Sequence, residues 1–304
     1  MSKILVTGGA GFIGSNLIDL LLESGSKAED IYIVDNLATE TGKKENINSN
    51  ILEENCFFKD IRDIFSQKSE IPEKLKDVRT VFHLAALARI QPSFKRPIET
   101  YDVNSLGTFL VCEYARKIGA KLIYSGSSSF YAGPHLNPYA FSKWSGEEVC
   151  KLYSKVYDLK TGVARFFNVY GPRQPIEGVY ATVVGIFQRQ WLNHEPLTVT
   201  GDGEQRRDFT HVNDICRGLL AISKGEHNGD IFNLGREENY SINELANFFA
   251  DSEKTYIDAR PGEARESLAD ISFTREKTGW TPSVNLGDYV NSWTDDHLKN
   301  RRNK

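Results

Sequence analysis

Short apolar runs alternate with stretches of helical periodicity along the first half of the chain. The apolar runs at 4–6, 31–34, 80–84 and 121–124 have the length and composition of buried strands. After the first run, Ile13, Leu17, Leu20 and Leu21 recur with the spacing of one helix face, and Gly25 stands where a helix often ends. Further helical stretches lie near 101–118 and 140–157. Apolar strands that alternate with helices predict a parallel, doubly wound α/β sheet.

The pattern changes near residue 170, where prolines and glycines divide the chain into short pieces. Pro172, Pro175 and Pro196 are joined by Gly201 and Gly203, and the chain from 252 onward is polar and rich in arginine. We therefore expect a smaller α/β lobe beside the sheet. Because 209–212 and 231–234 resemble strands that return to the sheet, the predicted sheet domain is 1–168 with return segments near 208–234. The predicted smaller lobe is then 169–207 and 235–304.

The composition is that of a soluble globular protein. Of 304 residues, 40% are hydrophobic and 26% are charged, and 37 Lys and Arg against 41 Asp and Glu give a net charge of −4. This balance argues against nucleic-acid binding, and no apolar stretch reaches the ~18 residues of a membrane span. A strand pattern starts directly at the N-terminus, which predicts no signal peptide. The four cysteines show no CxxC spacing, so we expect no metal site and a cytoplasmic location.

A glycine-rich turn joins the first predicted strand to the first predicted helix. Gly8 permits the tight turn, Gly11 lets the backbone approach a pyrophosphate, and Gly14 lets the helix pack on the strand. The positive N-terminal end of that helix would then face the phosphates. Asp35 ends the second strand, 21 residues after Gly14, where a carboxylate accepts the ribose hydroxyls and repels a 2′-phosphate. The sequence therefore predicts a Rossmann-type domain that binds NAD.

Tyr139 and Lys143 lie four residues apart in a predicted helix, so they share one face. A tyrosine is a poor base at neutral pH, but a nearby ammonium and the positive nicotinamide ring lower the pKa of its phenol. Ser127, just beyond the fourth strand, can hydrogen-bond the reacting hydroxyl. An isolated pair of this spacing is common on helix surfaces. Its combination with the glycine turn favours a proton-transfer group.

Further motifs run in order along nearly the whole chain, which resembles the extended short-chain dehydrogenase/reductase family in its nucleotide-sugar epimerase/dehydratase branch. The matching motifs are GxxGxxG from Gly8 to Gly14, Asp60-Ile61, His83-Leu84-Ala85-Ala86, Asn104-x-x-Gly107-Thr108, Tyr139-x-x-x-Lys143, Arg165-Phe-Phe-Asn168-Val-Tyr-Gly-Pro172-Arg173, Gly201-Asp-Gly203-x-x-x-Arg207-Asp208-Phe209 and Arg260-Pro-Gly262. The resemblance selects Ser127 from the serines at 125–129, with Ser128 as the alternative.

This resemblance implies a set of residues that bind NAD. In it Asp60 and Ile61 would hold the adenine, Leu84, Ala85 and Ala86 would line the pyrophosphate and ribose, and His83 would be structural. The complete predicted set is Gly8, Gly11, Phe12, Ile13, Gly14, Asp35, Asn36, Asp60, Ile61, Leu84, Ala85, Ala86, Asn104, Tyr139, Lys143 and Phe166.

The resemblance also implies how a nucleotide sugar would bind. Arg207 and Arg260 would hold its diphosphate, and the Asn168 amide would contact the phosphates. Ser267 would stand at C2 of the sugar, where a small residue admits an N-acetyl group. Ser127 completes the predicted substrate site. We interpret Arg206, Arg236 and Arg265 as members of surface ion pairs.

The residues after Ser127 separate the branches of this family. The 4,6-dehydratases have an Asp-Glu pair there and the glucuronate decarboxylases a nearby glutamate, but this chain has Ser128, Ser129 and Phe130. The implied activity is therefore an NAD-dependent 4-epimerase of UDP-hexoses (UDP-Glc/UDP-Gal and UDP-GlcNAc/UDP-GalNAc). The alternatives are a nucleotide-sugar dehydratase, a UDP-glucuronate decarboxylase and, more remotely, a non-catalytic NAD-binding protein.

Two further features follow from the same resemblance. The helices near 101–118 and 140–157 correspond to those through which family members form a homodimer. The chain also departs from the family pattern, because the loop at 133–138 is short and Gly126 precedes Ser127 where a second serine is commoner. Both departures lie beside the predicted sugar site.

Overall fold

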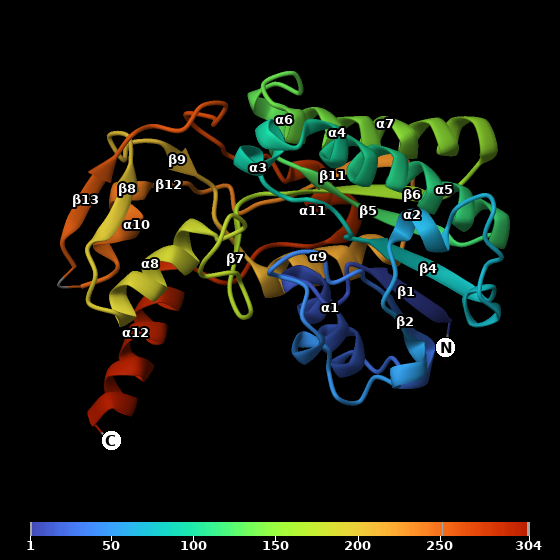
Figure 1. Cartoon of the computed structure of the whole chain (residues 1–304), viewed down its shortest axis with the longest axis horizontal. Helices are drawn as coiled ribbons and strands as arrows, with labels where there is room; N and C mark the ends of the chain where they lie inside the picture. The colour runs from blue at the N-terminus through green and yellow to red at the C-terminus, as the bar shows by residue number, and fades with distance from the viewer. Residues whose placement is uncertain (1, 251, 303–304) are drawn as a thin grey trace.

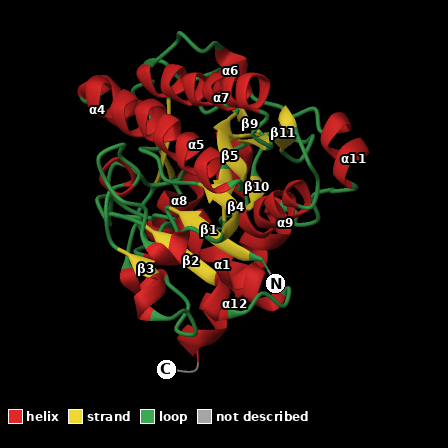
Figure 2. Cartoon of the chain, turned by 90° about the vertical axis from the view of Figure 1, so that its right-hand side faces the viewer, coloured by secondary structure: helices red, strands yellow, loops and turns green. Residues whose placement is uncertain are grey.

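Seven parallel strands form the main sheet of the computed structural model, which describes residues 2–250 and 252–302. The strand order is β11-β6-β5-β4-β1-β2-β3, which confirms the predicted doubly wound sheet (Figures 1 and 2). The strands are β1 (Lys3–Thr7), β2 (Ile31–Val34), β3 (Cys56–Phe57), β4 (Val78–His83), β5 (Lys121–Ser127), β6 (Thr161–Phe166) and β11 (Asn228–Leu234). Because all seven are parallel, their carboxyl ends meet at one edge of the sheet, where ligands of such folds bind.

Helices cover both faces of this sheet (Figure 1). On one face lie α1 (Phe12–Glu23) and α9 (Val212–Ser223), and on the other α5 (Gly107–Ile118) and α7 (Pro138–Tyr157). Each face has its own apolar cluster, with Leu17 and Leu219 in the first and Val111 and Val149 in the second, all almost fully buried. Two-sided burial explains why the strands are apolar at successive positions.

Shorter elements connect these layers. They are α2 (Ile61–Ile64), α3 (Ile90–Lys95), α4 (Pro97–Tyr101), a π-helical turn (Asp102–Leu106) and α6 (Ser129–Ala132), with 3-10 turns at Ala28–Asp30, Lys44–Asn46, Glu53–Asn55 and Glu73–Leu75. The predicted helix near 101–118 is thus the π-helical turn followed by α5.

The smaller lobe has its own apolar cluster, which includes Phe187, Phe209 and Leu245. Its strands pair two by two: β7 (Val169–Tyr170) with β10 (Thr210–His211), β8 (Leu197–Thr200) with β13 (Lys254–Ile257), and β9 (Arg206–Arg207) with β12 (Tyr240–Ser241). The lobe's helices are α8 (Val183–Leu192), α10 (Ile242–Asn247) and α12 (Leu286–Arg302). Figure 1 shows this lobe beside the carboxyl edge of the main sheet.

The structure corrects one expectation and refines a second. The strand predicted at 209–212 does not return to the main sheet, because β10 pairs with β7 and α9 begins at Val212. The strand at 231–234 does return, as part of β11 beside β6. Residues near α11 (Ser272–Thr278), assigned by sequence to the smaller lobe, pack with the main sheet, since Ile271 and Trp280 belong to its apolar cluster. The hydrophobic side chains of this segment therefore join the larger core.

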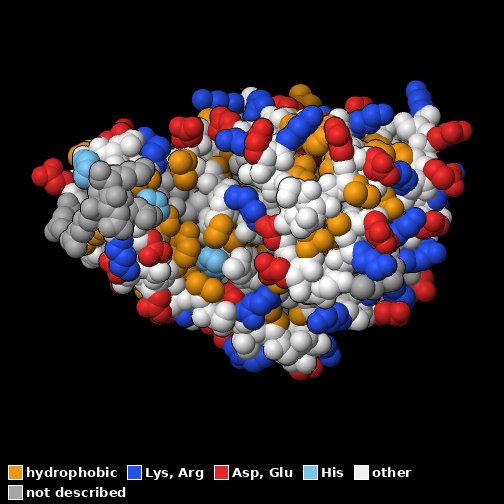
Figure 3. Space-filling model, turned by 90° about the horizontal axis from the view of Figure 1, so that it is seen from below, with side chains coloured by type: hydrophobic (Ala, Val, Ile, Leu, Met, Phe, Trp, Pro, Cys, Tyr) orange, Lys and Arg blue, Asp and Glu red, His pale blue; other side chains and the backbone are white. Residues whose placement is uncertain are grey.

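The described surface carries charges of both signs. Lysine and arginine side chains are interspersed with aspartate and glutamate over the face shown in Figure 3. Within the described residues, no helix combines the length and the hydropathy needed to cross a membrane. No group of His, Cys, Asp and Glu in the described part of the chain is arranged to hold a metal ion.

Candidate active site

The glycine turn between β1 and α1 is closely packed backbone. A Cβ atom at Gly14 would lie 2.1 Å from the carbonyl oxygen of Gly8, and one at Gly8 would lie 2.8 Å from the amide nitrogen of Ala85. Gly8 also has a φ of +72°, which disfavours other residues. Phe12 and Ile13 begin α1, so their N–H groups belong to the helix end that faces an anion. Side chains at Gly8 or Gly14 would therefore clash with the backbone of this turn, which we call the glycine cradle. Its exposed N–H groups fit the pyrophosphate of a dinucleotide.

Asp35 lies directly after β2 and holds the glycine turn in place. One carboxylate oxygen accepts a hydrogen bond from the Ala10 N–H at 3.0 Å, and the other accepts one from the Leu37 N–H at 2.9 Å. Burial raises the pKa of this carboxyl, while these two bonds oppose the rise. The side chain therefore joins the end of β2 to the cradle, and its contact with the ribose stays a prediction.

The three residues predicted around the adenosine lie together beside α2. Asn36 donates a hydrogen bond to Asp60 at 2.8 Å, and Asp60 also pairs with Arg62 at 2.8 Å and caps α2. Ile61 is buried and packs against Gly107. A Cβ atom at Gly107 would lie only 2.7 Å from the Ile61 side chain. The arginine pairing is the largest cause that lowers the pKa of Asp60, so this carboxylate stays charged.

The segment after β4 is braced from two sides. The Leu84 and Ala85 N–H groups donate to the carbonyl and hydroxyl oxygens of Thr7, at 3.1 and 3.3 Å. Asn104 accepts from the Leu87 N–H at 2.8 Å and donates to the Leu87 carbonyl and to the Ser142 hydroxyl. Both amide protons of Asn104 are thus used within the protein. Its direct contact with the cofactor stays a prediction, and Ala86 lies within the braced segment.

His83 is buried beneath this segment, in agreement with its predicted structural role. The Thr108 hydroxyl donates to the Asn104 carbonyl, so it accepts from Nε2 of His83, at 3.1 Å. Nδ1 of His83 then accepts from the Thr7 hydroxyl, at 2.8 Å. Burial, with the charge of Lys143, lowers the pKa of His83 to about 3. The imidazole is therefore neutral and fixes the strand end.

Tyr139, Lys143 and Ser127 come together at the carboxyl end of β5. Burial raises the pKa of the Tyr139 phenol, while a hydrogen bond from Ser127 and the charge of Arg89 lower it. The Ser127 oxygen accepts from the N–H and the hydroxyl of Ser129, at 3.2 and 2.9 Å, so the proton of the Ser127 hydroxyl stays available for donation. The structure thus brings Ser127 to the phenol. The alternative, Ser128, donates its backbone N–H to the Phe166 carbonyl.

Lys143 projects from α7 toward β5. Its Nζ donates to the Ser125 hydroxyl at 3.3 Å and lies 4.4 Å from the centre of the Tyr124 ring. Burial lowers the pKa of Lys143 to about 8, although the charge of Glu147 opposes this effect. Further oxygen partners would stabilise the charged form of this buried ammonium. The hydroxyls of a nicotinamide ribose would supply them.

A buried ion pair packs against the turn at 127–130, which we call the catalytic turn after the role predicted for Ser127. Arg165 in β6 pairs with Glu147 in α7, with its Nη2 at 2.6 Å from a carboxylate oxygen, and both side chains are almost fully buried. The guanidinium also stacks on Phe130, 3.7 Å from the ring centre. A Cβ at Gly126 would lie 2.8 Å from the Glu147 carboxylate. This packing explains why Gly126, a departure from the family pattern, precedes Ser127.

The predicted sugar side of the site lies after β6. Phe166 ends β6, and Asn168, with a φ of +21°, donates its side-chain amide to the Ser267 hydroxyl at 3.2 Å. The Asp208 N–H donates a hydrogen bond to the Ser267 carbonyl at 3.1 Å. The structure thus brings together Asn168 and Ser267, which are 99 residues apart in the sequence.

Arg207 lies in β9 of the smaller lobe, and Arg260 directly precedes Pro261, whose carbonyl accepts a hydrogen bond from Gln91 at 2.9 Å. Arg207 is largely buried and pairs with Glu263, with 3.6 Å between its Nη2 and a carboxylate oxygen. Arg260 is exposed. Of the arginines interpreted as surface pairs, Arg206 pairs with Glu244 at 2.9 Å, Arg236 with Glu238 at 3.1 Å and Arg265 with Asp202 at 2.8 Å, which confirms that interpretation.

Asn137, in the short loop at 133–138, makes hydrogen bonds to two segments. Asn137 accepts from the Ala140 N–H at 2.8 Å and so caps α7, with Pro138 as the first helical residue. The same side chain donates to the Gly262 carbonyl at 3.1 Å. The loop therefore links the helix that carries Tyr139 to the segment that carries Arg260.

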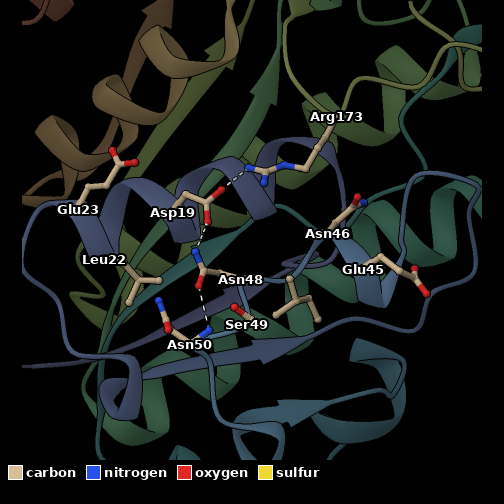
Figure 4. A pocket seen from close by; sticks show the side chains of 10 residues that line it. Asp19, Leu22, Glu23, Glu45, Asn46, Asn48, Ser49, Asn50 and Arg173 are labelled. Atoms are coloured by element: carbon tan, nitrogen blue, oxygen red, sulfur yellow. Dashed lines mark hydrogen bonds and ion pairs between the residues drawn. The ribbon is translucent and has the colours of Figure 1, made fainter. Parts of the chain in front are cut away.

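A polar hollow elsewhere on the surface is not the reaction site. It is lined by α1 and the 45–50 segment together with Arg173 (Figure 4). Its side chains pair with one another: Arg173 with Asp19 at 2.5 Å, and Asn48 with Asp19 at 2.7 Å. These contacts fix the segment after β7 to α1 and leave the predicted site residues outside the hollow.

Sequence reasoning missed four residues of this region. Glu147 lies one further helical turn beyond Lys143, on the face that carries Tyr139, and this spacing could have found it. Arg89, Asn137 and Glu263 carry no local pattern, because each meets its partners across the fold.

Comparisons with known proteins agree with this geometry. Residues 4–235 match the NAD dependent epimerase/dehydratase family. A Methanocaldococcus jannaschii protein named "Putative UDP-glucose 4-epimerase" is 36% identical over 94% of this chain and 95% of its own. UDP-glucuronic acid decarboxylase 6 of Arabidopsis thaliana is 32% identical over 93% and 85%.

A solved structure shows the same likeness in three dimensions. The crystal structure of UDP-glucose 4-epimerase from Thermotoga maritima with UDP-glucose matches with a TM-score of 0.85 and 32% identity, and covers 97% of this chain and 99% of that one. Together with the glycine cradle and the Tyr139–Lys143 pair, these matches show that the chain belongs to the NAD-dependent epimerase/dehydratase family and uses NAD as its cofactor.

Proposed function

We propose that this protein is a 4-epimerase of UDP-hexoses, which interconverts UDP-glucose with UDP-galactose and UDP-N-acetylglucosamine with UDP-N-acetylgalactosamine. The observation that carries the proposal is the composition of the catalytic turn. Ser127 meets Tyr139, and the residues that follow it are Ser128, Ser129 and Phe130, with Phe130 stacked on the buried Arg165. No carboxylate of this turn is available for an elimination or a second proton transfer.

The chemistry needs one base and one hydrogen-bond donor at the sugar C4. Bound NAD supplies the acceptor for the C4 hydride. The Tyr139 phenolate takes the proton of the 4-hydroxyl, Ser127 donates a hydrogen bond to O4, and Lys143 holds the ribose. The 4-keto sugar would then turn about its diphosphate so that its other face is presented to the nicotinamide site, and Tyr139 would return the proton to O4. Binding energy from the nucleotide, far from C4, allows this rotation without release.

The direct test is a substrate screen without added NAD. The protein is mixed separately with UDP-glucose and UDP-N-acetylglucosamine, and the C4 epimers are followed by NMR. We expect an equilibrium mixture in each case. A dehydratase or decarboxylase would instead lose water or carbon dioxide from its nucleotide sugar, which mass spectrometry detects. A non-catalytic NAD-binding protein would give neither change. In such a protein Tyr139 and Lys143 would have no catalytic role.

Ser267 is the residue that we expect to decide between plain and N-acetylated sugars. Its small, half-buried side chain lies against Asn168 at the proposed C2 position. Ser267→Tyr should lower kcat/KM for UDP-N-acetylglucosamine by about a hundredfold and leave UDP-glucose within a few-fold, because the ring fills the space for the acetyl group. Ser267→Ala is the matched control and should keep both activities. Equal losses for the two substrates would contradict this assignment.

We also propose that the protein is a homodimer joined through α4, α5 and α7, which lie side by side in Figure 1. Large apolar side chains are exposed on these helices, among them Ile98 at 84%, Val156 at 57% and Tyr157 at 52%. Such a patch favours association. Ile98→Asp combined with Val156→Asp should shift the mass measured by light scattering from dimer to monomer, while Leu52→Asp, on another surface, should not. A wild-type monomer would refute the proposal.

A further inference from the structure

A buried carboxylate joins distant segments of the chain beside the proposed sugar site. Asp208 lies directly after β9, and its side chain has no exposed surface. Its oxygens accept hydrogen bonds from backbone N–H groups and one hydroxyl: those of Arg236 at 2.8 Å, Glu237 at 3.1 Å, Ala269 at 3.1 Å and Thr210 at 3.3 Å. The donors lie on three separate stretches of the chain, which Asp208 therefore holds together.

One of these stretches carries Ser267, the residue that we place at C2 of the sugar. The Asp208 N–H donates to the Ser267 carbonyl at 3.1 Å, and the Ser267 N–H donates to the Arg206 carbonyl at 3.1 Å. The Asn168 amide donates both to the Asp208 carbonyl and to the Ser267 hydroxyl, at 3.3 and 3.2 Å. Asp208 thus fixes Ser267 through its backbone and, two residues further on, fixes Ala269 through its carboxylate.

The far end of this segment is tied to the catalytic turn. The side-chain amide of Asn233 in β11 donates to the Asp270 carbonyl at 2.8 Å, and its side-chain oxygen accepts from the Tyr131 hydroxyl at 2.9 Å. Tyr131 lies in α6 and directly follows the catalytic turn. Residues 267–270 are therefore held between Asn168 at one end and the catalytic turn at the other.

The packing around the carboxylate depends on a glycine. A Cβ at Gly235 would lie 2.2 Å from the Cβ of Ala269 and 3.0 Å from an Asp208 carboxylate oxygen. Because Gly235 has no side chain, the Ala269 N–H can come within hydrogen-bond distance of that oxygen. The hydrogen-bond partners of the carboxylate in the described chain are all neutral groups. Its hold on the segment therefore depends on hydrogen-bond geometry and not on a counter-charge.

We propose that Asp208 is a positioning residue for sugar selectivity: by holding residues 267–269 it sets the space at C2 of the hexose, and with it the preference between plain and N-acetylated UDP-sugars. This inference rests on the proposed function, in which Ser267 faces C2. An N-acetyl group would contact the wall that Asp208 holds, whereas the smaller 2-hydroxyl of a plain sugar reaches less far. Binding of the N-acetylated sugar therefore depends more strongly on the exact place of Ser267.

Calorimetry on the NAD-bound protein tests this proposal without requiring turnover. Dissociation constants are measured for UDP-glucose, UDP-N-acetylglucosamine and UDP. Asp208→Ala removes the acceptor of the Ala269 N–H, and Gly235→Ala displaces the same segment while it keeps the carboxylate. Asp208→Asn is the conservative variant. Its amide oxygen can still accept from the N–H groups of Glu237 and Ala269, which share one carboxylate oxygen in the wild type.

Asp214→Ala is the matched control. Asp214 is equally buried and accepts from the N–H groups of Ser283 and Val284, at 2.9 and 3.0 Å, so it joins α9 to a different segment. Its loss should lower the free energy of unfolding but leave the ratio of the two sugar dissociation constants unchanged. A merely structural role of Asp208 would give this same result.

We expect Kd for UDP-N-acetylglucosamine to rise about tenfold relative to Kd for UDP-glucose in Asp208→Ala and in Gly235→Ala, while Kd for UDP changes less than about threefold. Adding Ala269→Gly to Gly235→Ala removes the nearest clash and should restore most of the selectivity. Asp208→Asn should keep the wild-type ratio within about threefold. If Asp208→Ala does not fold, Gly235→Ala and its double variant decide.

Equal weakening of both sugars in Asp208→Ala and Gly235→Ala, or an unchanged ratio in both, would overturn the proposal. A shift in Asp208→Asn as large as that in Asp208→Ala would also contradict it, because the segment would then depend on the charge. A wild type that binds both sugars but forms no C4 epimer would refute the 4-epimerase and leave this role intact. One that does not bind UDP-N-acetylglucosamine would refute this role.

Discussion

Replacing Tyr139 by Phe is expected to lower kcat for UDP-hexose epimerisation by about a thousandfold. The substitution removes one oxygen, which is the atom proposed to carry the proton between C4 and the enzyme. The ring itself remains, so the packing around it and the hydrogen bond from the Tyr139 N–H to Ser93 are preserved. The measurement is the rate of C4 epimer formation, followed by NMR with the NAD that the protein retains and none added.

Two controls make this result specific. Tyr157→Phe removes the same atom from an exposed tyrosine on the same helix, and it should leave the rate unchanged. Circular dichroism and NAD content should match wild type in both variants. A Tyr139→Phe protein with full activity would show that the proton leaves through another group, and the proposed mechanism would fail.

Breaking the ion pair between Glu147 and Arg165 is expected to destabilise the fold by about 3–5 kcal/mol. Glu147 is fully buried, and its two oxygens accept three hydrogen bonds from the guanidinium, at 2.6, 3.0 and 3.2 Å. Glu147→Gln leaves the arginine charge in a buried place without its counter-charge, which costs far more than the loss of one contact. The free energy of unfolding, measured with urea at one fixed NAD concentration, tests this.

The neighbouring pair on the same helix is a matched control. Glu148 pairs with Lys151 at 2.8 Å, but both side chains are exposed, so Glu148→Gln should cost less than about 1 kcal/mol. The double change Glu147→Met with Arg165→Met should recover part of the stability, because it removes both buried charges at once. A loss of less than about 0.5 kcal/mol in Glu147→Gln would show that solvent reaches the pair.

The same ion pair connects stability to the site. Arg165 lies between Glu147 and the ring of Phe130, which follows Ser127 in the catalytic turn. Loss of the pair should therefore loosen the position of the Ser127 hydroxyl as well as the core. We expect kcat in Glu147→Gln to fall more than KM rises, since the residues proposed to bind the diphosphate, Arg207 and Arg260, lie elsewhere, on the smaller lobe.

The cofactor half of the site could be predicted from the sequence because its signals are local. Gly8, Gly11 and Gly14 lie in one turn, and the fold requires glycine there since a Cβ at Gly14 would meet the Gly8 carbonyl at 2.1 Å. Tyr139 and Lys143 share a helix face through their spacing alone. The apolar strands likewise predicted the parallel sheet, because residues buried on both faces must be apolar at consecutive positions.

The rest depends on contacts between distant parts of the chain. Asn168 meets Ser267 across 99 residues, and Arg89 is fixed by Tyr180 across 91. Likewise, the strand predicted at 209–212 pairs with β7 instead of the main sheet, because its partner is chosen by the packing of the smaller lobe.

The sequence by itself determined the sheet, the glycine cradle and the Tyr139–Lys143 pair, since each follows from spacing within one element or one turn. Only the tertiary structure decided which charges lie near the site: Arg89, whose charge lowers the pKa of the Tyr139 phenol, and the buried pair of Arg165 with Glu147. The physical reason is that the electrostatic energy of a buried group depends on distances across the fold and on burial, and neither is encoded in a local pattern.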